Sequence, residues 1–184
     1  MTDILIGNGT LIVLGDATDH NPTAGVAPTD ADTDQIDLTS LAAGAYRQSA
    51  KFDFGATRAR EWQMRAAIEP VSAPTAGGAV EFFLGFSNSA TAANANPGNL
   101  SGSDAAWVGY GAAATDADEV VGQLVRVGQL VFGADDDIQV GEVGVFTPWQ
   151  RYGILVVRNG LSVALESDAV EMSIHLSPVV DQTV

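Results

Sequence analysis

The sequence contains no cysteine, a single lysine (Lys51) and two histidines (His20 and His175) among its 184 residues. The absence of cysteine excludes disulfides, thiolate metal sites and cysteine nucleophiles, and is typical of maturation in a reducing cytosol. Basic residues number 8 against 23 acidic ones, which gives a formal net charge of −15 at pH 7. Nucleic acids and anionic lipids are bound through lysine and arginine, so we expect neither nucleic acid nor a membrane as partner.

Long apolar runs are also missing. No apolar stretch approaches the ~20 residues of a membrane-spanning helix, and the N-terminus Met1-Thr2-Asp3 is acidic where a signal peptide is basic. We therefore expect a soluble chain without an export signal. A length of 184 residues, 46% of them hydrophobic, suits one globular domain over residues 1–184.

The composition disfavours long helices. The chain has 20 glycines and 7 prolines, whereas long helices favour leucine, lysine and glutamate. Apolar residues alternate with polar or small ones in residues 79–86 and 169–176, which predicts two strands with one buried face each. Residues 57–68 alternate in the same way, with one face formed by Trp62, Met64, Ala66 and Ile68.

Turn residues between apolar runs predict how the strands pair. Asn159-Gly160 separates residues 154–157 from residues 161–165, and this dipeptide is the strongest short-range signal for a two-residue hairpin. Gly7-Asn8-Gly9 indicates a first hairpin or arm within residues 4–14. Two further pairs are expected on similar grounds, residues 46–54 with 57–68 and residues 124–132 with 138–146.

These segments amount to about nine to eleven short strands without a helical period between them. The pattern predicts an all-β fold, namely a single-domain antiparallel β-sandwich or jelly roll with long loops. Residues 1–14 are expected to form an N-terminal hairpin, or an arm that adds a strand to a neighbouring molecule. Short helices are expected at most in residues 104–106 and 117–121.

Residues 87–104 form the longest irregular segment, rich in serine, asparagine, alanine and glycine. Long ordered loops are often contact surfaces, so this segment is a candidate recognition loop for a sugar or a protein. The alternative is an Ω-like loop that packs on its own turns, and this is the interpretation we favour.

Several stretches resemble a known group of proteins. Residues 85–91 read Gly-Phe-Ser-Asn-Ser-Ala-Thr and residues 96–102 read Asn-Pro-Gly-Asn-Leu-Ser-Gly. Residues 143–148 read Val-Gly-Val-Phe-Thr-Pro, and they are followed by Arg-Tyr-Gly-Ile at 151–154 and by Asn159-Gly160. Over residues 80–178 this pattern is similar to small virion structural proteins of tailed bacteriophages.

The resemblance implies a β-sandwich that decorates or cements the capsid. Its partners would be the major capsid protein and copies of itself, in trimers or hexamers that match virion symmetry. It would lie on the capsid surface of the virion after assembly in the host cytoplasm. A tail- or fibre-associated module that binds host glycan through residues 87–104 is the alternative. The resemblance assigns no catalytic or binding residue to this chain.

Candidate catalytic groups form no recognisable constellation, so we expect a protein without enzymatic activity or cofactor. Residues 85–89 approach a nucleophile elbow around Ser87 but lack its closing glycine. Neither His20 nor His175 has an evident partner. Residues 109–114 fit a glycine-rich nucleotide fingerprint, but no βαβ unit surrounds them. Carboxylate pairs are so numerous that a glycosidase remains only a third hypothesis.

The acidic clusters are weak metal-site candidates. Asp30, Asp32 and Asp34 alternate as calcium ligands do, but Gln35 and Leu41 stand where an EF-hand needs glycine and glutamate. A calcium site of another type remains open there, at residues 135–137, and around Asp116, Asp118 and Glu119. We favour the interpretation that these are solvated loop tips that keep the protein soluble.

The basic residues are unevenly distributed. Five of the eight lie between positions 47 and 65, whereas the first forty residues contain none. Pairing of residues 46–54 with 57–68 would gather these side chains into a patch for an acidic capsid surface or another copy. The alternative is that they pair with carboxylates of their own chain. The candidate partner-binding residues are Arg47, Lys51, Arg58, Arg60 and Arg65.

Overall fold

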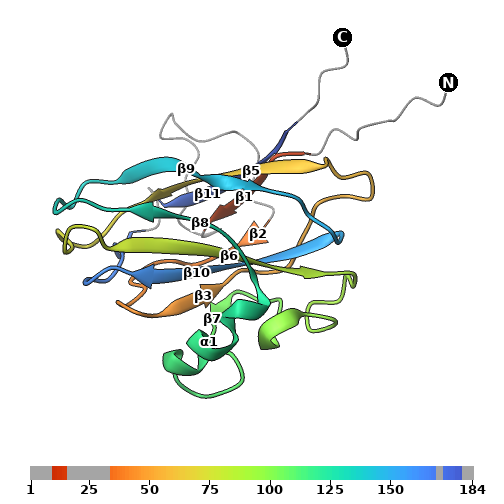
Figure 1. Cartoon of the computed structure of the whole chain (residues 1–184), viewed down its shortest axis with the longest axis horizontal. Coiled ribbons are helices and arrows are strands. Elements are labelled where there is room, and N and C mark those ends of the chain that lie inside the picture. The colour runs from red at the N-terminus through yellow and green to blue at the C-terminus, as the bar shows by residue number, and fades with distance from the viewer. Residues whose placement is uncertain (1–9, 16–33, 169–171, 180–184) are drawn as a thin grey trace, which may run out of the picture.

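Two sheets pack face to face in this protein (Figure 1). The computed structural model describes residues 10–15, 34–168 and 172–179. The first sheet has the order β2-β1-β11-β5-β9, from β1 (Ile12–Gly15), β2 (Asp34–Gln35), β5 (Glu61–Ile68), β9 (Gln139–Phe146) and β11 (Ser173–Val179). The second has the order β7-β3-β10-β6-β8, from β3 (Tyr46–Gln48), β6 (Ala79–Ser87), β7 (Ala105–Ala106), β8 (Val125–Val131) and β10 (Tyr152–Gly160), with β4 (Phe52–Asp53) also paired to β10. The predicted all-β sandwich is confirmed.

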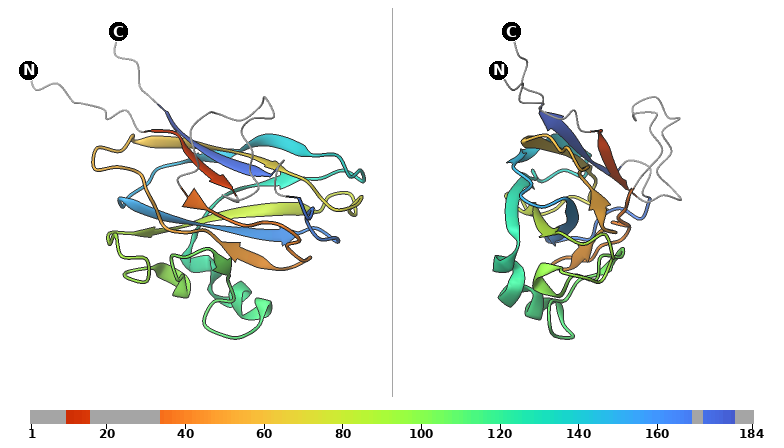
Figure 2. Two further views of the ribbon diagram at one scale, coloured as in Figure 1. Left: turned by 180° about the vertical axis from the view of Figure 1, so that it is seen from behind. Right: turned by 90° about the vertical axis from the view of Figure 1, so that its right-hand side faces the viewer.

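The strand pairing is nested. β1 lies beside β11, β3 beside β10, β5 beside β9 and β6 beside β8, so the pairs run from the ends of the chain inward to its middle. A long hairpin folded over a core produces this order, and the two resulting layers are visible in Figure 2. The strand order is therefore jelly-roll-like.

A core of large apolar side chains fills the space between the sheets. The predicted buried face of β5 is confirmed, since Trp62, Met64, Ala66 and Ile68 are at most 3% exposed. They belong to one cluster with the inward residues of β6, which are Val80, Phe82, Leu84 and Phe86. Burial of each large apolar side chain stabilises the fold by about 1.5–3 kcal/mol, so this cluster is the main source of stability.

Residues 88–124, which we call the cap, cover part of the outer face of the second sheet, over β3, β6 and β10. The helical turns of the cap are η2 (Pro97–Asn99), α1 (Ala114–Val120) and η3 (Val121–Gln123). Leu100 and Trp107 of the cap pack with Phe83 in a second core. Gly85 makes room for Leu100, because a Cβ at this position would lie 2.4 Å from a Leu100 methyl group. The prediction that residues 79–86 leave one face exposed is therefore wrong.

The Asn159-Gly160 hairpin does not form. β10 runs through both residues, and neither has the positive φ that the predicted turn requires. Asn159 is buried, and its side chain binds backbone groups both of Leu41, 118 positions away, and of the residues that follow it. Its Nδ2 donates to the carbonyls of Leu41 and Val163 at 2.8 and 2.9 Å, and its Oδ1 accepts from the Leu161 N–H at 3.0 Å. The signal was misleading because this asparagine satisfies buried backbone groups rather than a turn.

Two other predicted strand pairs are also wrong. β3 and β4 pair with β10 in the second sheet, whereas β5 pairs with β11 and β9 in the first. Likewise β8 pairs with β6, and β9 pairs with β5. The chain crosses from one sheet to the other at both connections. A short loop can connect two strands of the same sheet or two strands of different sheets. Which of these forms depends on which sheet offers an apolar face to the second strand.

The described part of the N-terminal segment is not a free arm. β1 is paired with β11, and Ile12, Val13 and Leu14 are at most 5% exposed. The remainder of residues 1–14, with Gly7-Asn8-Gly9, lies outside the described residues. Of the short helices expected, residues 117–121 fall in α1 and η3, but residues 104–106 contain β7. No helix within the described residues is long and apolar enough to cross a membrane.

The edge strands β8 and β9 meet through opposed β-bulges. Val127 is the extra residue of β8 against β6, and Val143 is the extra residue of β9 against β5. A Cβ on Gly128 would lie 2.0 Å from the carbonyl oxygen of Val143, and a Cβ on Gly144 would lie 2.6 Å from that of Val127. Glycine at both positions thus permits the close backbone approach that brings the two sheets together along this side.

We predict that Gly128→Ala and Gly144→Ala each lower the free energy of unfolding by about 1–3 kcal/mol, because the added methyl group forces the two edges apart. Gly122→Ala is the matched control, since a Cβ at Gly122 meets nothing within 4 Å. The control should be as stable as the parent chain or slightly more stable. Chemical denaturation measures the differences, and equal stability of all three variants would contradict the edge contact.

Candidate functional site

The five basic residues expected to bind a partner lie at three separate places. Arg47 lies in β3, beside β7. Lys51, Arg58 and Arg60 lie near the end of the sandwich where β6 and β9 finish. Arg65 is exposed on the outer face of β5. These residues do not share one face, because the strands that carry them belong to different sheets.

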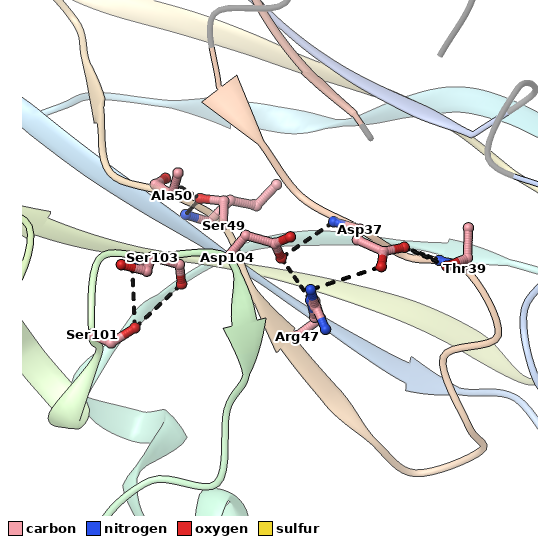
Figure 3. A network of polar contacts seen from close by, with 9 residues as sticks. Asp37, Thr39, Arg47, Ser49, Ala50, Ser101, Ser103 and Asp104 are labelled. Carbon is pink, nitrogen blue, oxygen red and sulfur yellow. Dashed lines mark hydrogen bonds and ion pairs between the residues drawn. The ribbon is translucent and has the colours of Figure 1, made fainter. Parts of the chain in front are cut away.

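Arg47 makes contacts within its own chain (Figure 3). Its Nε donates to Asp104 Oδ1 at 2.6 Å, and its Nη2 lies 3.9 Å from Asp37 Oδ2. Asp104 also accepts from the Asp37 N–H at 3.3 Å. Close by, the Ala50 N–H donates to the Gln35 carbonyl at 2.8 Å. These contacts tie the segment around β2 of the first sheet to β3 and β7 of the second, so Arg47 has a structural role.

Lys51 holds the first half of the cap. Its Nζ donates to Ser87 Oγ and to the carbonyls of Ser89, Thr91 and Asn94, all within 3.1 Å. Burial lowers the pKa of Lys51, but four oxygen acceptors favour its ammonium form. A serine beside a lysine is the arrangement of some nucleophiles. Here Ser87 is 0% exposed and the ammonium is bound by carbonyls, so the pair is a structural link.

The loop that follows β6 packs on its own turns, in agreement with the Ω-like interpretation. Asn96 Nδ2 donates to two carbonyls of this loop, at 2.6 and 2.7 Å. Asn99 Nδ2 donates to the carbonyl of Gly109 at 2.6 Å. A Cβ at Gly102 would lie 2.1 Å from the Ala92 carbonyl oxygen, which shows how closely the two arms of the loop approach. The side-chain Nδ2 groups of both asparagines therefore bind backbone carbonyls of their own chain.

Aromatic and basic side chains meet at the end of the sandwich where β6 and β9 finish. This end is on the right of Figure 1. We call it the arginine end, formed by residues 51–61, 86–87 and 147–152. Trp149 is 64% exposed, and its ring centroid lies 5.0 Å from that of Phe86. Arg58 donates to the carbonyls of Pro148 and Trp149 at 3.0 and 3.2 Å. These contacts hold an exposed indole in a defined position, which lowers the entropy lost on binding.

A second guanidinium at the arginine end belongs to Arg151. It binds Asp53 through two bonds, Nη2 to Oδ2 at 2.7 Å and Nε to Oδ1 at 2.9 Å, and it lies 5.2 Å from the ring of Tyr152. Arg151, together with the N–H of Gly55, lowers the pKa of Asp53. This end carries four basic side chains, those of Lys51, Arg58, Arg60 and Arg151, and two acidic ones, those of Asp53 and Glu61. It is therefore locally positive, although the whole chain has a net charge of −15.

A cluster of polar side chains fastens α1 to the second sheet. The hydroxyl of Tyr46 donates to Asp118 Oδ1, and Arg158 Nη1 donates to Glu81 at 2.8 Å. The guanidinium of Arg158 also lies 5.6 Å from the Tyr46 ring. Burial and the bond to Asp118 raise the pKa of Tyr46, so its hydroxyl stays protonated as a donor. Asp118 is thus occupied in anchoring the cap.

No group of three or more metal-ligating side chains occurs among the residues that the structure describes. Asp30 and Asp32 lie outside these residues, and the backbone of Asp34 begins β2. Asp116 accepts from two N–H groups at the start of α1, each at 2.9 Å. Residues 135–137 form the exposed tip between β8 and β9.

The remaining catalytic candidates are spread over the molecule. His20 lies outside the described residues, and His175 is half-buried on the outer side of β11. The glycine-rich residues 109–114 lead into α1, whose seven residues are not the crossover helix of a βαβ unit. Tyr110 in this stretch is 66% exposed.

No protein-family model, curated protein or solved structure matches this chain. Among the residues of the arginine end, the sequence singled out Lys51, Arg58 and Arg60 as partner-binding candidates, but not Trp149 and Arg151. Arg58 and the carbonyl it binds at Pro148 are 90 positions apart, so no local pattern joins them. The only sequence signal was a tryptophan and an arginine in one turn between two strands, a composition typical of binding surfaces.

We predict that Lys51→Met lowers the free energy of unfolding by about 1–3 kcal/mol, because it removes charge-assisted hydrogen bonds to the loop. Amide hydrogen exchange should accelerate more in residues 88–96 than in the rest of the chain. Arg65→Met, on the exposed face of β5, is the control and should change stability by less than about 0.5 kcal/mol. Unchanged amide hydrogen exchange in residues 88–96 would contradict the role of Lys51 in holding this loop.

Asp53 should make stability depend on pH. Its pKa is lowered in the folded state, chiefly by Arg151, so the pair stabilises the protein above the ordinary aspartate pKa of about 3.9. This stabilisation is lost as the pH falls through the lowered folded-state pKa. Asp53→Asn should therefore be less stable than the parent chain at neutral pH, and the difference should shrink below about pH 4. Denaturation curves across this range measure it, and a constant difference would refute the pairing.

Proposed function

We propose that this protein is a structural component of a tailed-bacteriophage virion, bound to the outside of the capsid shell as a decoration or cement protein. The observation that carries the proposal is the arginine end, where an exposed indole and two guanidinium groups, those of Arg58 and Arg151, are held by contacts within the chain. Tryptophan and arginine dominate the binding energy of protein interfaces. The partners under this proposal are the major capsid protein and further copies of the chain.

The position of the phage-like segments supports this proposal. Residues 85–91 lie more than fifty positions before residues 143–148 and 151–154 in the sequence but are adjacent to them in the fold. β6 and β10 pair at this end, with Tyr152 opposite Ser87, and the rings of two residues in these segments, Phe86 and Phe146, lie 6.4 Å apart. Three of the five stretches that carry the resemblance therefore meet at the arginine end, beneath the exposed Trp149. Residues 96–102 lie in the cap, and Asn159-Gly160 lies at the other end of β10.

The fold by itself favours no single function. Jelly-roll sandwiches serve as viral capsid domains and as lectins, and folds host many unrelated functions. A tail-associated glycan-binding module is thus the second candidate. Its expected recognition loop, residues 87–104, uses the side-chain amides of Asn96 and Asn99 internally. This engagement leads us to favour the decoration role, in which many weak contacts on a shell sum to stable attachment.

Quantitative mass spectrometry of purified phage particles tests the proposal. We expect roughly one copy per shell subunit, or per local three-fold group of subunits, as shell symmetry requires. Particles assembled with Trp149→Ser should contain fewer copies than particles with Tyr110→Ser, a matched loss of an exposed aromatic residue outside the arginine end. A few copies per particle would favour the tail module, and complete absence from particles would refute a virion role.

A further inference from the structure

The end of the sandwich opposite the arginine end is strongly acidic. Three connections meet there, residues 69–78, 132–138 and 161–168, and we call this the acidic end. The Glu166 N–H donates to the Glu69 carbonyl, and the Phe132 N–H donates to the Gly78 carbonyl, both at 2.9 Å. These segments contain no lysine or arginine, and their six carboxylates are Glu69, Asp135, Asp136, Asp137, Glu166 and Asp168.

Apolar side chains are exposed beside these carboxylates. Val131 at the end of β8 and Val140 near the start of β9 are 55% and 65% exposed. The close approach of these strands places Val131 and Val140 opposite each other, since Gly128 lies against Val143. Ile138 and Val71 of the same end are 36% and 48% exposed. Half of the chain's large exposed apolar residues, within the described part, thus lie at or beside the acidic end.

The two ends are fixed on opposite sides by the direction of the strands. β6 and β9 both start at the acidic end, at Ala79 and Gln139, and both finish at the arginine end, at Ser87 and Phe146. At about 3.3 Å per residue, these strands separate the two ends by roughly 25 Å. The acidic end is on the left of Figure 1 and the arginine end on the right.

We propose that the arginine end of one copy binds the acidic end of a second copy. The two surfaces are complementary in two respects. Trp149 can pack on the exposed Val131 and Val140, while Arg60 and Arg151 face the three aspartates of residues 135–137. Arg60 is exposed, and the side chain of Arg151 is 46% exposed even with Asp53 bound. A guanidinium presents five donors in a fork, so it can bind a second carboxylate.

The net charge of −15 does not prevent this contact at physiological salt. Exposed charges more than about 8 Å apart are largely screened there, so only the residues that meet across the interface matter. The contact joins two different surfaces and is therefore heterologous. Repeated head to tail, it closes into a ring if the rotation between copies permits, and otherwise it forms a filament. The inference does not depend on a virion role.

Charge-reversal variants test the proposal. Arg60→Glu with Trp149→Ser disables the arginine end, and Asp136→Lys with Asp137→Lys disables the acidic end. Each variant retains the other end intact. The matched controls make comparable changes away from the proposed interface, at three exposed positions and in the edge strand β2. They are Arg65→Glu with Tyr110→Ser, and Asp34→Lys with Glu119→Lys. Circular dichroism and thermal unfolding confirm that every variant is folded before association is measured.

Sedimentation velocity over a range of concentrations gives the result. The parent chain and both controls should self-associate, more strongly at low than at high salt. Each end variant alone should associate at least tenfold more weakly. A mixture of the two end variants should form dimers and nothing larger, because one intact arginine end meets one intact acidic end.

Three outcomes would overturn the proposal. The first is a parent chain that stays monomeric at every concentration. In that case the partner of the arginine end would be an acidic shell protein rather than a second copy. The second is association that the end variants do not weaken relative to their controls. The third is a mixture of the two end variants that stays monomeric, since a self-complementary interface would behave in that way.

Discussion

Burial of β6 and β10 on both faces is the constraint on which the rest of the structure depends. The core between the sheets covers one face, and the cap covers the other. Every polar side chain next to these strands must then find a partner, because an unpaired buried group costs about 1–3 kcal/mol. The buried polar residues within the described part are Gln48, Ser49, Ser87 and Asn159, and each bonds to backbone of another segment. These bonds join the cap and the loops to the central strands.

The same constraint decides which surfaces are open to a partner. The cap occupies the outer face of β3, β6 and β10, and the bulges of β8 and β9 bring the sheets together along one side. The Arg47 contacts tie the sheets at the opposite side. Loops therefore gather at the two ends of the strands, and rigid scaffolds commonly carry their binding groups on such loops. The exposed indole at one end and the exposed valines beside the other follow this rule.

The two ends of the sandwich carry opposite local charge, which the net charge of the whole chain does not reveal. A formal charge of −15 suggests uniform repulsion, but Arg58, Arg60 and Arg151 converge at the end where β9 finishes. Six carboxylates and no basic residue gather where β9 begins. At physiological ionic strength such local differences govern association more than the net charge does. The virion proposal depends on the arginine end, and the head-to-tail proposal depends on both ends.

The sequence by itself determined the fold class, the inward face of β5 and the absence of thiol chemistry, because alternation and composition are local properties. It did not determine which strands pair. The Asn159-Gly160 signal failed since that asparagine bonds to distant backbone, and the predicted hairpins of residues 46–68 and 124–146 are crossings between sheets. The arginine end joins Arg58 to a carbonyl 90 positions away. Only tertiary structure decided these features, because sheet choice and loop convergence depend on long-range packing that a sequence window does not contain.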